Sequence, residues 1–471
     1  MEVDPQTEVP LRSGNERDLL NDPVGKTLFL FALPALGVNI LQTLNGSISA
    51  AWVGQLLGEA ALAATANAGM IMFLALSGVI GFSMAATILI GQFAGRGDMV
   101  GARRIFGGAV GMFLLFGIAT AILGWIFTPQ LLNMLAMPAE AYGLALAYLP
   151  FVFLGMPIYF IMILLSASLR GVGDAVTPLR SSIANVLLAL VLNPVLILGL
   201  GPFPEMGVAG AGLAMLLAGL ISTIYLMQQI YAQDISIRLR GSELAFMKPT
   251  MRVAAPVLGM GLPIGLSVIV MSLSGLVMIG LINREGVDTA AAYGVLMQIW
   301  SYVMMPTAAV SGAVSAMAAQ NIGANKWNRV SSIAWSGMGI NTAMSAVLVA
   351  ISIIFAKPLL WLFLDPESAA IPIAIHINHL VGWTYIVMGI SMITSSVVRA
   401  NGAVYPPLLL LFISMILVRV GFGLWLHPDY GANAIWFAFG MSAIASLIMG
   451  IGYYLYGNWR DKKPMEMAAF S

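Results

Sequence analysis

The sequence predicts an all-α membrane protein with twelve transmembrane helices in two six-helix lobes, and three observations lead to this prediction. The 471-residue chain is 60% hydrophobic and only 9% charged, whereas soluble domains carry about 25% charged residues. Its apolar runs are long enough to cross a bilayer as helices, and too continuous for the alternating strands of an outer-membrane barrel. The third observation is an internal repeat, in which the second half follows the first at an offset of 228 or 229 residues.

Twelve apolar runs separated by short polar turns define the predicted spans. They cover residues 27–53, 60–92, 105–127, 143–168, 178–200 and 207–230, then 254–282, 288–320, 332–362, 373–398, 406–427 and 432–457. From these runs we expect a tail (1–26), a lobe (27–230), a linker (231–252), a second lobe (253–458) and a tail (459–471). Because each half has an even number of spans, the two copies start on the same side and are parallel repeats.

The repeat is carried by residues that recur at matching places. Leu33-Pro34 matches Leu262-Pro263, and further matched pairs are Gly46 with Gly275, Gly58 with Gly286, Gln92 with Gln320, Arg170 with Arg399 and Gly173 with Gly402. A proline inside a span removes an intrahelical hydrogen bond and permits a bend. The duplication of Pro34 and Pro263 therefore predicts that the first and seventh helices bend during the protein's cycle.

The charged residues predict the orientation and exclude several classes of function. Eighteen of the 21 Lys and Arg residues fall in tails and loops on one side, so both termini should be cytoplasmic by the positive-inside rule. The first 26 residues are acidic and lack a basic segment leading into a short apolar core, which is not the pattern of a cleaved signal peptide. A net charge of +1 argues against nucleic-acid binding. With no cysteine, disulfides and thiolate metal sites are excluded, and no cofactor is expected.

The architecture favours a transporter over a channel or an enzyme. Two similar bundles that face one another leave a central cleft, and rocking exposes this cleft alternately to each side. The sequence has no recognisable selectivity filter of the kind that a channel needs. A membrane-embedded enzyme needs acids, histidines or metal ligands that converge at membrane depth, and none can be assembled from these spans.

Several short motifs, in their order and duplication, resemble a known transporter family. They are Leu33-Pro34, Ala51-Trp52-Val53-Gly54, Gly91-Gln92-Phe93-Ala94-Gly95-Arg96-Gly97-Asp98, Ala319-Gln320-Asn321-Ile322-Gly323-Ala324, Leu169-Arg170-Gly171-Val172-Gly173-Asp174, Arg399-Ala400-Asn401-Gly402 and Leu192-Asn193-Pro194. Over residues 20 to 458 the chain is similar to the multidrug and toxic compound extrusion (MATE) transporters of the flippase-like (MOP) superfamily. This resemblance implies export of amphipathic, often cationic compounds in exchange for protons or sodium.

The resemblance also implies a buried acid for the coupling ion, and here the sequence departs from the family. All twenty Asp and Glu residues fall in tails or loops. Measured from the motifs, the first-helix acid position holds Ser49, the fifth-helix acid position holds Asn193 with Ala189 as its partner, and the tenth-helix acid position holds Met388. We therefore take Ser49 and Asn193 as ion-coupling candidates and Met388 as a substrate-binding candidate.

Arg419 is the one always-charged residue placed inside a predicted span. Because a buried arginine is costly, we expect it to face a cavity and to bind an acidic group on the substrate, or to replace a bound cation. The competing interpretation is that it reaches outward to the interface, or donates to helix carbonyls.

Two further groups of polar residues lie at helical spacing. His376 and His379 are three residues apart near one end of the tenth span and could take up a proton, although histidines hydrogen-bonded at the interface are the commoner case. Asn39, Gln42 and Asn45 share one face of the first helix with Ser49. These side chains either line a substrate cavity or hold helices together by hydrogen bonds.

The sequence thus predicts a multi-pass protein of the inner or plasma membrane that exports amphipathic drugs, toxins or metabolites by alternating access, as a proton or sodium antiporter. Its expected partners are a small-molecule substrate, a proton or sodium ion and the lipid bilayer, with no nucleic acid, and a monomer is expected. One alternative is a flippase or exporter of a lipid-linked or biosynthetic product without cation coupling. Another is a transport-dead structural or sensor relative that keeps the fold.

Overall fold

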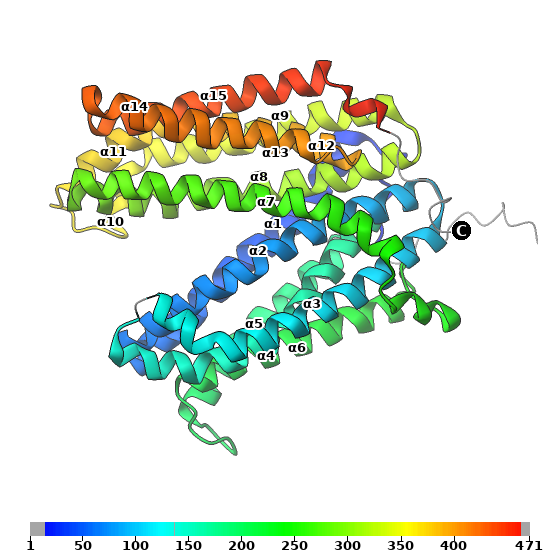
Figure 1. Ribbon diagram of the computed structural model, residues 1–471, viewed down its shortest axis with the longest axis horizontal. Helices are drawn as coiled ribbons and strands as arrows, with labels where there is room; N and C mark the ends of the chain where they lie inside the picture. The colour runs from blue at the N-terminus through cyan, green and yellow to red at the C-terminus, as the bar shows by residue number, and fades with distance from the viewer. Residues whose placement is uncertain (1–14, 136, 463–471) are drawn as a thin grey trace, which may run out of the picture. The chain divides into compact units, whose positions relative to one another are not determined.

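The computed structural model describes residues 15–135 and 137–462 and is almost entirely helical (Figure 1). Residues 1–14 and 463–471 of the expected tails lie outside the described residues. The helices of the first half are α1 (Val24–Leu57), α2 (Glu59–Gly95), α3 (Met99–Met134), α4 (Ala139–Val172), α5 (Val176–Leu198) and α6 (Val208–Ala232). The linker contains η1 (Gly241–Met247). The second half contains α7 (Met251–Ile282), η2 (Asn283–Glu285), α8 (Val287–Gly323), α9 (Trp327–Ile354), α10 (Ala356–Trp361), α11 (Ala370–Val381), α12 (Thr384–Ala400), α13 (Tyr405–Phe412), η3 (Ile413–Val420), α14 (Gly421–Tyr430), α15 (Ala432–Tyr456) and η4 (Asn458–Asp461).

The predicted fold class is confirmed. Within the described residues, eleven helices are long and apolar enough to cross a membrane, and there are up to twelve when the bent pair α11–α12 counts as one span. A helix satisfies its backbone hydrogen bonds internally, which the hydrocarbon core of a bilayer requires. The predicted tenth span is the bent pair, with an angle of 41° between α11 and α12.

Two of the matched glycine pairs of the repeat occupy turns with a positive φ. Gly58 and Gly286 precede α2 and α8 with φ of 84° and 106°. Gly173 and Gly402 follow α4 and α12 with φ of 98° and 81°. Glycine adopts these angles without strain, so the same turn recurs in each half because the same glycine recurs.

The chain divides into two compact units. Within the described residues, unit 1 contains 15–18 and 37–262, and unit 2 contains 19–36 and 263–462. These units differ from the predicted lobes (27–230 and 253–458) because the first part of α1 joins unit 2 and the first part of α7 joins unit 1. Both helices change unit close to a matched proline, α1 between Leu36 and Gly37, and α7 between Leu262 and Pro263.

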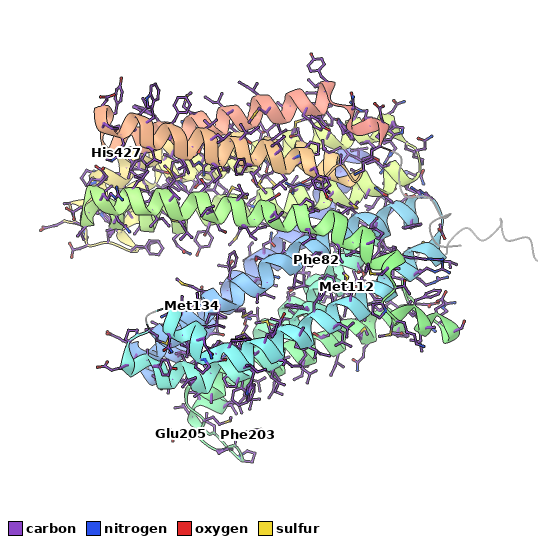
Figure 2. All side chains as sticks on the ribbon, in the orientation of Figure 1. Phe82, Met112, Met134, Phe203, Glu205 and His427 are labelled. Atoms are coloured by element: carbon purple, nitrogen blue, oxygen red, sulfur yellow. The ribbon has the colours of Figure 1, made fainter. Side chains whose placement is uncertain are left out.

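In unit 1, α4 packs against α2, α3 and α6, and α5 packs against α6 (Figure 1). Phe82 of α2, labelled in Figure 2, contacts the first part of α7, because a Cβ on Gly261 would lie 2.3 Å from the Phe82 ring. A small residue such as Gly261 therefore lets two helices of this unit approach closely.

The linker is held against α3 by packing and by an ion pair. Arg103 of α3 contacts Glu243 at 2.9 Å, and the glycines Gly107, Gly108 and Gly111 face residues 246–253. Within the linker, Arg240 donates two hydrogen bonds to Asp234, which holds the pKa of that carboxyl below its usual value. The linker is thus an ordered part of unit 1.

In unit 2, α8 packs against α9, and α12 packs against α8, α9 and α15. Hydroxyl pairs join these helices inside the bundle. Ser311 and Ser396 lie 2.6 Å apart, Ser391 and Ser446 lie 2.7 Å apart, and Thr307 and Ser345 lie 3.3 Å apart. Such interhelical hydrogen bonds satisfy hydroxyls that the bilayer would leave without partners.

The two units repeat one polar contact at the same place. In unit 1, Asn45 of α1 donates to Asn185 of α5 at 3.1 Å. In unit 2, the residue 229 positions after Asn45 is Ser274 of α7, which donates to the carbonyl of Met415 at 2.9 Å. The repeat therefore preserves a hydrogen bond between its first and fifth spans, although the side chains differ.

We expect Gly111→Ala to destabilise unit 1, because a Cβ there would lie 2.0 Å from the Met247 carbonyl oxygen. Overpacking of this kind costs about 1–3 kcal/mol. Gly143→Ala is the matched control, since Gly143 lies in α4 with no atom within 4 Å of an added Cβ, and alanine favours a helix by about 1 kcal/mol. Thermal unfolding of the purified variants should show a lower midpoint for Gly111→Ala alone. Equal midpoints would contradict the close packing of the linker on α3.

Candidate functional site

The span that carries Arg419 contains a π-helix, η3 (Ile413–Val420), between α13 and α14. A π-helix is wider than an α-helix and often marks a functional position. One of its carbonyls, that of Met415, accepts the hydroxyl of Ser274 from α7. The buried side chains of this segment are Ser414, Met415 and Arg419, so the irregular turn directs the arginine into unit 2.

Arg419 is 7% exposed and its contacts are neutral. Its Nε donates to Ser442 Oγ of α15 at 2.9 Å, and an Nη contacts Met388 Sδ of α12 at 3.7 Å. The guanidinium carbon lies 4.4 Å from the centre of the Phe439 ring, which is cation–π distance. Ser442 in turn donates to the Phe439 carbonyl. Among residues 15–135 and 137–462, no carboxylate forms an ion pair with Arg419.

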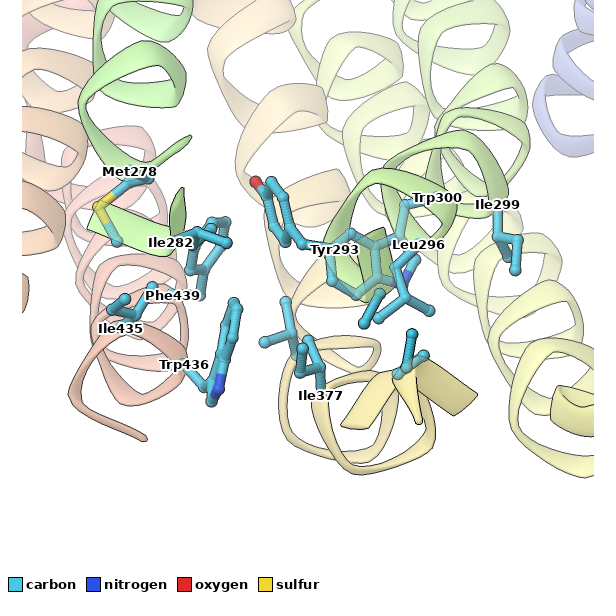
Figure 3. Close-up of a cluster of buried hydrophobic side chains, with 14 of the residues drawn as sticks. Met278, Ile282, Tyr293, Leu296, Ile299, Trp300, Ile377, Ile435, Trp436 and Phe439 are labelled. Carbon is cyan, nitrogen blue, oxygen red and sulfur yellow. The ribbon is translucent and has the colours of Figure 1, made fainter. Parts of the chain in front are cut away.

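Phe439, whose ring lies against Arg419, belongs to a cluster of buried hydrophobic side chains that includes several large aromatic rings (Figure 3). Tyr293 of α8 stacks on Trp436 with ring centres 5.9 Å apart, and its ring centre is 6.3 Å from that of Phe439. Trp300 lies edge-on to Tyr293 at 6.0 Å and 5.1 Å from Tyr385. The electron-rich faces of such rings are favourable neighbours for a cation and for planar organic molecules.

The structure brings two of the predicted substrate residues together, Arg419 and Met388. In the hydrogen bonds of the described chain, the acceptors of Arg419 are the side chains of Ser442 and Met388. Arg419 therefore neither reaches outward nor donates to a helix carbonyl there. Arg419 is buried within unit 2, and that it faces a cavity stays a prediction. Whether it binds substrate stays a prediction.

The two histidines of the ion-coupling prediction lie on the exposed side of α11. His376 Nε2 is 3.2 Å from Asn433 Oδ1, and His379 Nδ1 is 2.7 Å from the Ile375 carbonyl of its own helix. These contacts fit histidines hydrogen-bonded near a helix end. The third histidine, His427 at the end of α14 (Figure 2), is 2.6 Å from Glu285 of η2.

The candidates on α1 lie in unit 1, whereas Arg419 and Met388 lie in unit 2. Asn45 donates to Asn185 and so joins α1 to α5. The Asn39 carbonyl accepts the Thr43 hydroxyl, Gln42 is exposed and Ser49 is partly buried. For Asn45, the structure agrees with the interpretation that these polar residues hold helices together.

Asn193 is a buried candidate with an unused acceptor. It is 1% exposed, and its Nδ2 donates to the Ala189 carbonyl at 2.7 Å. Its Oδ1 has no hydrogen-bond partner among the described residues. An amide oxygen of this kind could accept a proton donor or a cation.

Several residues of these sites are not predicted from the sequence. Ser442 and Phe439 contact Arg419 from α15, and Asn185 contacts Asn45 from α5. A serine in an apolar span carries no distinguishing signal, because serines also serve as helix contacts. Asn185 lies eight residues before Asn193 in the same predicted span, and this spacing could have placed both on one helix face.

Comparison with known proteins gives a family. The MatE family model matches residues 34–195 and 263–425, so each half carries one copy. The chain is 29% identical over 442 residues to the probable multidrug resistance protein YoeA of Bacillus subtilis (strain 168), covering 93% of this chain and 95% of YoeA. It is 24% identical to an FAD transporter of Shewanella oneidensis, covering 74% of this chain and 76% of that protein.

The fold has a match among solved structures. The crystal structure of a MATE protein in the bent conformation superposes with a TM-score of 0.84 at 21% identity, covering 94% of this chain and 96% of that one. The two MatE matches begin at Pro34 and Pro263, the matched prolines of the repeat. The chain is therefore a multi-pass plasma-membrane transporter that belongs to the MATE family.

Proposed function

We propose that this protein exports amphipathic small molecules by alternating access, as a secondary antiporter that takes up a proton or a sodium ion in return. The match of both halves to the MatE family carries the proposal. The named activity of YoeA as a probable multidrug resistance protein supports a broad substrate range. The change of unit in α1 and α7 next to Pro34 and Pro263 supports bending at these prolines, since proline weakens a helix at its own position.

Transport without cation coupling is the second candidate, and the position of the acids favours it. Within the described helices, Glu59, Glu140 and Asp288 lie in the first turns of α2, α4 and α8. Asp174, fully buried, caps α5 by accepting the amides of Val176 and Thr177. A neutral group such as Asn193 Oδ1 would hold a cation only weakly. If no such site binds a coupling ion, the substrate gradient alone drives transport, and the protein is a flippase or facilitator.

The proposed substrate carries an anionic group that Arg419 contacts. The guanidinium has five N–H donors, and its two hydrogen bonds are to a hydroxyl and a thioether. A buried charge without a counter-charge favours an anion that supplies one. The related FAD transporter has a substrate with phosphate groups and a planar ring system, which is the chemistry that an arginine beside aromatic rings would recognise.

The coupling proposal is tested by efflux from proteoliposomes. A fluorescent dye should leave vesicles that contain the purified protein faster under an imposed proton or sodium gradient than without a gradient. Protein-free vesicles under the same gradients are the control. Efflux that ignores both gradients would support the uncoupled alternative, and the absence of efflux for every dye would support a transport-dead relative.

The Arg419 proposal predicts a change in substrate charge preference. Arg419→Gln keeps a hydrogen-bond donor but removes the charge, so export of an anionic dye should fall by roughly 10-fold or more, while export of a cationic dye of similar size should persist. Arg419→Lys keeps the charge and should retain part of the anionic activity. An equal loss for both dyes in Arg419→Gln would indicate a structural role instead.

A further inference from the structure

Asn341 of α9 is a fully buried amide without a hydrogen bond. It is 0% exposed, and both its Oδ1 and its Nδ2 lack a partner among the described residues. Other buried amides in the described chain, such as Asn193 and Asn401, leave only the oxygen unpaired. Because an unpaired buried donor or acceptor destabilises a fold, a side chain that leaves both unpaired calls for a functional explanation.

Asn378 of α11 shows what the same residue type does when it is paired. It is 2% exposed, and its Oδ1 accepts Trp300 Nε1 of α8 at 3.0 Å. Its Nδ2 donates to the Ser352 carbonyl of α9 at 2.9 Å. This asparagine therefore joins α11 to α8 and α9 by satisfied hydrogen bonds.

Asn341 lies directly against the backbone of α12. A Cβ on Gly389 would be 2.1 Å from Asn341 Nδ2, so only a glycine permits this approach. One turn earlier on α9, Gly337 lies against Ile393 of α12. One turn later, Ser345 pairs with Thr307 of α8. The unpaired amide is thus the polar position on α9 that faces α12.

α12 is the second half of the bent span, and its first half is anchored. The 41° bend falls at Gly382 and Trp383. α11 is fixed before the bend by the hydrogen bonds of Asn378. After the bend, Met388 precedes Gly389 and contacts Arg419. A small pivot of α12 about the bend would therefore change the surroundings of Asn341 and of Arg419 together.

We propose that Asn341 is a positioning residue for transport, whose amide hydrogen-bonds to α12 in a second arrangement of unit 2 and so stabilises that arrangement. In the arrangement described here the amide is unpaired, which destabilises this arrangement and favours the pivot. This inference rests on the proposed transport function. It adds a role for a residue outside the site described above. In the hydrogen bonds and ring contacts of the described chain, Asn341 contacts neither Arg419 nor the aromatic side chains near it.

The test compares Asn341→Ala with Asn378→Ala, two buried asparagines of unit 2 that lose the same atoms. Thermal unfolding in detergent should show a lower midpoint for Asn378→Ala, because Trp300 and Ser352 lose their partner. Asn341→Ala should unfold at the wild-type midpoint or above it. The export assay in proteoliposomes uses a dye that the wild type exports. Asn341→Ala should lower the maximal rate of its export by roughly fivefold and leave the apparent KM unchanged.

Gly389→Ala provides a second variant at the same contact. Its added methyl group should displace the amide and lower both the unfolding midpoint and the export rate. Combining it with Asn341→Ala should restore the midpoint, because the obstructing amide is gone, but should not restore the export rate.

Two results would overturn the inference while leaving the transport proposal intact. One is a midpoint for Asn341→Ala as low as that of Asn378→Ala, which would mean that the amide already has a partner such as an ordered water. The other is an unchanged export rate in Asn341→Ala. Absence of transport in the wild type would instead overturn both proposals.

Discussion

The hydrocarbon core of a bilayer contains no hydrogen-bond partners, and this constraint shapes both units of the protein. It requires helices throughout the spans, because only a helix satisfies its own backbone in each segment. It also requires that polar side chains inside the bundles find partners there. Many donate to a carbonyl of their own helix, as Thr223 does to that of Gly219. Others pair across neighbouring helices, as Ser391 does with Ser446 and Asn45 with Asn185.

Against this background, the few polar groups that break the rule are informative. Arg419 has a permanent charge but only neutral partners. Asn193 keeps an unused oxygen and Asn341 an unused amide. Each is buried in the interior of its unit, where an unsatisfied group is costly. Among the buried polar groups without a full set of partners, we interpret these three residues as positions at which the fold gives up stability for substrate, ion or conformational change.

The duplication explains why the two units share a framework but differ in chemistry. Turn glycines and the prolines of α1 and α7 recur because they determine backbone geometry. Side chains inside the units are free to diverge once the backbone is fixed. The contact of Asn45 with Asn185 is replaced by that of Ser274 with a carbonyl, and Leu190 stands where the second copy has Arg419. At this matched position, therefore, only unit 2 carries a buried arginine.

The sequence by itself determined the spans, the repeat, the turns and the presence of a charge inside the eleventh span. These features depend on local composition and on patterns within one helix, which can be read along the chain. The tertiary structure decided which unit each part of α1 and α7 joins. It also decided that Arg419 meets Met388 and Ser442, and that Asn378 is paired while Asn341 is not. These outcomes depend on contacts between residues far apart in the chain. Neither hydrophobic periodicity nor charge pattern in a single sequence indicates which of these residues meet.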